Sequence, residues 1–145
     1  MRIFAALIAG LVANYVAAEV INMNPDVIGG FVFGRNTTGG VEMRLYLDPT
    51  EQAVSVRDWD GVARFIWLKG FASALAGGMV FAWIAGPGSL PIAVLSAAPV
   101  WIETVSLAEQ VPSYEGTAYF VVGFSVLGAI LGASFIGRWQ RGQFP

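Results

Sequence analysis

Residues 65–84 read FIWLKGFASALAGGMVFAWI, and this stretch decides the fold. It holds a single charged residue, Lys69, and has about the 20 residues that an α-helix needs to cross a lipid bilayer. Three further apolar runs of similar length occupy residues 3–22, 90–108 and 117–137. The pattern predicts an all-α integral membrane protein, built as a four-transmembrane-helix bundle with up-down topology.

The composition of the whole chain, residues 1–145, agrees with a single membrane domain. The chain is 56% hydrophobic and only 12% charged, whereas about 25% of the residues in soluble domains are charged. It has no cysteine and no histidine, the usual ligands of haem, zinc and iron–sulfur clusters. We therefore expect no cofactor, no metal site and no enzymatic activity. A net charge of −2 gives no reason to expect nucleic acid as a partner.

The connections between the runs predict the topology. Residues 86–89, GPGS, and residues 110–116, QVPSYEG, are short turns, so successive runs should be antiparallel. An even number of spans places both termini on one side of the membrane. Arg2, Arg138 and Arg141 lie there in short flanks. Four arginines, at positions 35, 44, 57 and 64, are spread over the long connection on the other side, so the number of basic residues does not decide the orientation but their density favours cytoplasmic termini. The expected location is the bacterial inner membrane, with the lipid bilayer as the first partner.

The long connection, residues 23–63, is the one segment large enough to fold outside the bilayer. Residues 41–47, VEMRLYL, alternate with the period of a half-buried strand, and residues 30–34, GFVFG, could pair with them. Turn-forming residues lie between the two. The segment predicts a β-hairpin that rests on the outer face of the bundle, because an isolated hairpin is only marginally stable in water.

Two carboxylates and one amine lie inside the predicted spans at nearly the same depth. At a rise of about 1.5 Å per residue from the outer boundary, Glu19 lies about 4.5 Å down, Lys69 about 6 Å and Glu103 about 7.5 Å. We expect Lys69 to bridge the two carboxylates. Three roles are open for this layer: a clamp that fixes helix register, separate snorkelling of each group to the headgroups, or an ion or proton site.

Other polar and helix-breaking residues accompany this layer. Tyr15 shares a helical stripe with Glu19 because it precedes it by four residues. Asn14 lies near mid-membrane with no charge beside it, and we expect its carboxamide to form a hydrogen bond to another helix. Pro99, in the middle of the third run, should kink that helix.

Small residues recur at intervals of four along three of the runs. They are Gly70, Ala74, Gly78 and Ala82 in the second run, Gly128 and Gly132 in the fourth, and Ala9, Ala13 and Ala17 in the first. Stripes of this kind let helix backbones approach closely in a membrane. The partner of the second-run stripe is either another helix of this chain or a helix of another chain.

These features favour a non-catalytic membrane protein, an accessory or assembly subunit of a larger inner-membrane complex. The small-residue stripes offer packing surfaces for other membrane subunits or for a second copy, and the predicted hairpin needs support. The alternative is a small oligomeric transporter or channel that uses the layer of Glu19, Lys69 and Glu103. So short a chain would have to oligomerise to enclose a pathway.

Overall fold

The computed structural model describes residues 1–23, 59–86, 89–110 and 115–143, which are almost entirely helical. The elements in chain order are α1 (Arg2–Met23), α4 (Trp59–Ala85), α5 (Leu90–Ala93), the 3₁₀ turn η1 (Val94–Ala97), α6 (Ala98–Gln110) and α7 (Glu115–Gln140). The all-helical prediction is confirmed for this part of the chain, which contains no strand. The predicted β-hairpin falls on residues 30–47, outside the described residues.

Three of the helices are long and apolar enough to cross a membrane. Their spans are Arg2–Met23, Phe65–Ala85 and Gly116–Gln140. These bounds agree with the first, second and fourth predicted runs to within three residues. The third run forms a broken segment whose apolar part, Leu90–Ser106, is shorter than the other three.

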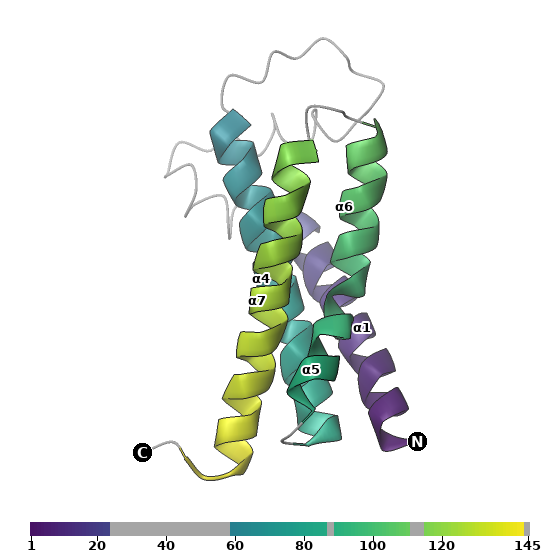
Figure 1. The fold of residues 1–145 in the computed structure, drawn as a ribbon, viewed down its shortest axis with the longest axis vertical. Coiled ribbons are helices and arrows are strands. Elements are labelled where there is room, and N and C mark those ends of the chain that lie inside the picture. The colour runs from purple at the N-terminus through teal and green to yellow at the C-terminus, as the bar shows by residue number, and fades with distance from the viewer. Residues whose placement is uncertain (24–58, 87–88, 111–114, 144–145) are drawn as a thin grey trace.

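The helices alternate in direction, and α4 lies between α1 and α7 (Figure 1). Both chain termini lie at the same end of the bundle, which we call the terminal end. There the Arg2 Nε donates to the Ile84 carbonyl oxygen at 2.5 Å, and the Gln140 amide donates to that of Trp83 at 3.1 Å. We call the other end, where α1 ends and α4 begins, the opposite end. The predicted up-down order of the helices is thereby confirmed.

The closest packing joins α4 and α7, which run parallel and are not neighbours in sequence. A Cβ added to Gly128 would overlap the carbonyl oxygen of Phe71, and one added to Gly132 would overlap that of Leu75. From the other side, a Cβ on Gly78 would overlap the backbone of Ala129. The small-residue stripes therefore bring two backbones of the same chain into contact, as GxxxG motifs do in membranes.

Helix α1 packs on the other face of α4 through glycines. A Cβ on Gly10 would lie 3.0 Å from the carbonyl oxygen of Gly77, and a Cβ on Gly77 would lie 2.9 Å from that of Gly10. The buried stripe of α1 consists of Ala6, Gly10, Asn14 and Ala18. The predicted stripe of Ala9, Ala13 and Ala17 is therefore wrong by one residue, a rotation of about 100° around the helix axis. Those three alanines are only half-buried.

Pro99 explains why the third segment is broken. A proline has no N–H and its ring crowds the carbonyl four residues earlier, so a continuous α-helix cannot run through it. Here the Leu95 carbonyl accepts instead from the N–H of Ala98, three residues on, which closes the 3₁₀ turn η1. The predicted irregularity at Pro99 is present as this turn, which separates α5 from α6.

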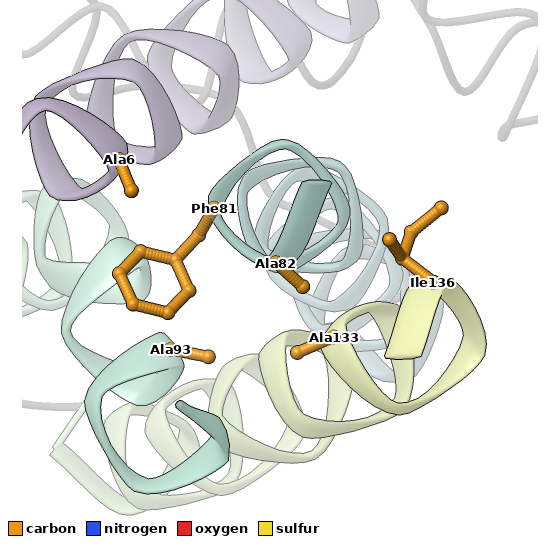
Figure 2. Packing of buried hydrophobic residues seen from close by; sticks show 6 residues of the cluster. All are labelled: Ala6, Phe81, Ala82, Ala93, Ala133 and Ile136. Atoms are coloured by element: carbon orange, nitrogen blue, oxygen red, sulfur yellow. The ribbon is translucent and has the colours of Figure 1, made fainter. Parts of the chain in front are cut away.

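The described core is made of small side chains around one aromatic ring. Phe81 of α4 is fully buried and points between α1 and α5 (Figure 2). Alanines from its own helix and from three neighbouring elements surround it: Ala82 of α4, Ala6 of α1, Ala93 of α5 and Ala133 of α7, with Ile136 at the edge. Because each alanine contributes little volume, the helices lie close together and most large side chains remain on the outside of the bundle.

Candidate functional site

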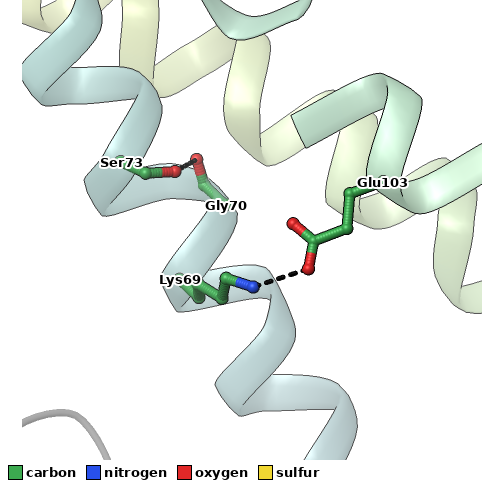
Figure 3. Close-up of polar contacts among 4 residues, drawn as sticks. All are labelled: Lys69, Gly70, Ser73 and Glu103. Atoms are coloured by element: carbon green, nitrogen blue, oxygen red, sulfur yellow. Dashed lines mark hydrogen bonds and ion pairs between the residues drawn. The ribbon is translucent and has the colours of Figure 1, made fainter. Parts of the chain in front are cut away.

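The two charged residues that the structure brings together are Lys69 of α4 and Glu103 of α6. The Lys69 Nζ lies 2.7 Å from the Glu103 Oε1, within both ion-pair and hydrogen-bond distance (Figure 3). Lys69 precedes Gly70, whose carbonyl accepts from the Ser73 hydroxyl at 3.3 Å. We call Lys69 and Glu103 the charged pair.

The two members of the charged pair differ in exposure. The Lys69 side chain is 10% exposed, whereas the Glu103 side chain is 55% exposed. An unpaired ammonium would be expensive to bury in an apolar bundle, and the carboxylate compensates its charge. Ile102 and Val105 of the same helix are also outward-facing, at 71% and 55% exposure. The pair therefore joins a buried position on α4 to an apolar outer face on α6.

The predicted bridge to Glu19 is not present. Among the described residues, the ion pair of Lys69 is with Glu103 and not with Glu19. The reason lies in helix geometry, because Ala18 faces α4 and Glu19 is turned about 100° away from it. Tyr15, one residue after the buried Asn14, is exposed on the outer face of α1 for the same reason. The expected layer of three ionisable groups is thus a pair, with Glu19 and Tyr15 outside it.

Asn14 is fully buried, and its carboxamide makes no hydrogen bond. Neither its Nδ2 nor its Oδ1 has a partner among the described residues, so the expected interhelical hydrogen bond is absent. The surroundings explain this, because Asn14 sits beside the Gly10–Gly77 contact, where backbones approach closely. The nearby Ser96 hydroxyl is directed to its own helix and donates to the Ala93 carbonyl at 2.7 Å.

A second polar contact, which the sequence did not indicate, joins α6 to α7. The Trp101 Nε1 donates to the Ser125 Oγ at 2.8 Å, and this hydroxyl donates to the Val122 carbonyl at 2.7 Å. Trp67 packs nearby, with its ring 5.9 Å from that of Phe124 and nearly parallel to it. Its buried Nε1 has no hydrogen-bond partner within the described part of the chain.

The predicted packing residues all act within the chain. Gly78, Gly128 and Gly132 make the backbone contacts between α4 and α7. Ala74 is buried with Ala97 and Ala129, and Ala82 belongs to the cluster around Phe81. A Cβ on Gly70 would lie 3.2 Å from the Val121 side chain. Of the two partners considered for this stripe, the structure shows a helix of the same chain.

Comparison with known protein families, characterised proteins and solved structures finds no match. Among the described residues there is also no group of three acidic, histidine or cysteine side chains that could hold a metal ion. Function must therefore be argued from the charged pair and from the surfaces that the bundle leaves uncovered.

Proposed function

We propose that this protein is a non-catalytic accessory or assembly subunit of a larger complex in a bacterial inner membrane. It would cross the bilayer four times, with the broken α5–α6 segment as the third span and both termini in the cytoplasm. The observation that carries the proposal is the outer face of α6, where the half-exposed Glu103 is accompanied by the exposed apolar side chains of Ile102 and Val105.

A face of this kind suits a protein partner better than lipid. Glu103 lies seven residues before the end of α6 at Gln110, or about 10 Å along the helix axis. A carboxylate at that depth is poorly solvated by acyl chains, and Lys69 contacts it from the bundle side only. A partner helix that offers a hydroxyl, amide or basic group could solvate the exposed side, while Ile102 and Val105 pack against it.

The exposed outer face of α1 supports the same proposal. Only 22% of its apolar window is buried, against 50% for α4 and 44% for α7. Its outer face carries Val12, Tyr15 and Val16, all exposed. A tyrosine among aliphatic side chains is frequent at protein interfaces, because its ring packs and its hydroxyl forms a hydrogen bond.

The test is the native mass of the tagged full-length protein after gentle extraction from its own membrane. We expect a defined hetero-complex, and we expect Ile102→Trp to release the protein from it. Ile102 is 71% exposed, so added bulk there blocks a partner without disturbing the bundle. Leu127→Trp, on an exposed position of α7, is the matched control and should leave the complex intact. A protein that is always monomeric, or equal effects of the two variants, would contradict the proposal.

Glu103 gives a second arm of the same experiment. Glu103→Gln should weaken the complex while leaving the isolated protein folded, whereas Glu109→Gln, on an exposed acid of the same helix, should not. If both variants behave like the parent, the carboxylate does not take part in partner binding.

The alternative is a small oligomeric transporter or channel that uses the layer of Glu19, Lys69 and Glu103, and the buried Asn14 beside the break at η1 favours it. Discontinuous helices with unpaired polar groups near mid-membrane are typical of transporter sites. This alternative predicts that Glu19→Gln or Glu103→Gln abolishes a flux in vesicles while the protein still folds. If both variants retain full function, the alternative fails.

A further inference from the structure

Acidic and basic residues of the described chain lie toward different ends of the bundle, and the terminal end carries the basic ones. The acidic residues in the described part of the chain, Glu19, Asp60, Glu103, Glu109 and Glu115, belong to the parts of α1, α4, α6 and α7 that are nearer the opposite end. The terminal end instead carries Arg2, Arg138 and Arg141. Among the described residues, the Arg138 side chain has no hydrogen-bond or ion-pair partner. Within the described residues, this end therefore carries basic side chains and no acidic one.

An apolar groove runs along the outside of the α4–α7 contact to this end. Leu75 and Met79 of α4 form one wall, and Leu131 and Phe135 of α7 form the other, around a volume of about 560 Å³. Gly132 also lines the groove, at the place where the backbones of α4 and α7 meet. Its volume lies within the range of about 300 to 1,000 Å³ that is typical of ligand sites.

The apolar groove leads into a smaller polar cavity of about 180 Å³. Ser134 and Arg138 line both, and the cavity adds Ser89 and Arg141. An arginine fork can bind a phosphate through two parallel hydrogen bonds, and the Ser134 hydroxyl can donate to a remaining oxygen. The Ser89 hydroxyl already donates to the Gly86 carbonyl at 2.8 Å. The polar cavity thus stands where a headgroup would lie if an acyl chain occupied the groove.

We propose that the groove binds an anionic phospholipid of the membrane leaflet at the terminal end. One acyl chain lies between the walls formed by Met79 and Phe135. The headgroup phosphate is held by Arg138, with Arg141 beside it. Basic pockets between transmembrane helices on the cytoplasmic side are a recognised way of binding anionic lipids, and each arginine contributes about fivefold to the affinity.

The proposal is tested by native mass spectrometry of the full-length protein in mild detergent, titrated with phosphatidylglycerol or phosphatidylcholine. We expect phosphatidylglycerol to bind about 5- to 25-fold more tightly, from one or two arginine contacts. Arg138→Gln should reduce this preference about fivefold. Arg2→Gln removes the same charge at the same end but outside the groove, and should not change it.

Two tryptophan variants test whether the groove itself holds the acyl chain. Leu131 and Leu127 are both 46% exposed and lie one turn apart on α7, but only Leu131 lines the groove. Leu131→Trp should abolish binding of the tight lipid, and Leu127→Trp should leave it unchanged. Equal binding of the two lipids, or equal effects of Arg138→Gln and Arg2→Gln, would overturn the proposal. So would a dimer that Leu131→Trp disrupts without any change in lipid binding, since a second copy would then occupy the groove.

Discussion

The contact of Gly132 with α4 gives the sharpest prediction about stability. A methyl group at this position would overlap the backbone carbonyl of Leu75, whereas nothing lies within 4 Å of a Cβ added to Gly123 on the same helix. Alanine favours a helix over glycine by up to about 1 kcal/mol, so Gly123→Ala should stabilise the protein by up to that amount. Gly132→Ala should instead force α7 away from α4, and overpacking of this kind destabilises by about 1–3 kcal/mol. The two variants should therefore differ by about 1–4 kcal/mol and lie on opposite sides of the parent.

The measurement is unfolding in mixed micelles with increasing dodecyl sulfate, followed by circular dichroism and tryptophan fluorescence. The Trp83 and Trp139 rings, 5.0 Å apart, join α4 to α7 and report their separation. Gly78→Ala, which meets the backbone of Ala129 from the other side, should resemble Gly132→Ala. If Gly132→Ala proves as stable as Gly123→Ala, the α4–α7 contact is looser than described and the argument is refuted.

Three further predictions concern the polar groups. Glu103→Gln should destabilise the protein by about 1–3 kcal/mol because it leaves the Lys69 ammonium buried without a countercharge. The double variant Glu103→Gln, Lys69→Met should regain most of that stability in the same unfolding assay. Asn14→Leu removes a buried amide that has no hydrogen bond, so it should leave stability unchanged or raise it by about 1 kcal/mol; a large loss would show that the amide is satisfied in the membrane. Trp101→Phe removes the hydrogen bond to Ser125 and should cost about 1 kcal/mol, whereas the same change should have no additional effect in a Ser125→Ala background.

Hydropathy and length predicted the helices because membrane helices must satisfy their own backbone groups. The bounds of α1, α4 and α7 lie close to the predicted runs, with α4 extended toward its N-terminus at Trp59. The irregularity at Pro99 was predictable for an equally local reason, since a missing N–H acts within its own helix. Properties that depend on one helix alone are therefore readable from this sequence.

The rotation of each helix about its own axis could not be predicted from the sequence. Counting residues gives the depth of Glu19 and Lys69, but it does not give the direction in which each side chain points. On α1 two small-residue stripes lie side by side, one through Ala9 and one through Gly10, and either could have faced α4. The choice follows from Gly77 on the facing helix, because two glycines in register allow the closer approach.

The pairing of α4 with α7 was also open, because turns connect each helix to its neighbours in sequence and favour those contacts. The parallel pair of α4 and α7 forms because Gly128 and Gly132 of α7 and Gly78 of α4 each let the facing backbone come into contact. The small-residue stripes of α4 and α7 are therefore buried against each other within the chain. The stripe that seemed to offer a surface to other subunits cannot serve that purpose here, so a partner must bind elsewhere.

The two exposed surfaces proposed as binding sites differ in chemistry and in position. Glu103 lies on α6 in the half nearer the opposite end, whereas Arg138 lies on α7 at the terminal end. The half-exposed Glu103 carboxylate, beside apolar side chains, suits a hydrogen-bond donor from another helix. Arg138, at the end of an apolar groove, suits a phosphate that carries an acyl chain. The two requirements involve different elements and share no residue. A protein partner at α6 and an anionic lipid between α4 and α7 can therefore bind together, and loss of one leaves the contacts of the other in place.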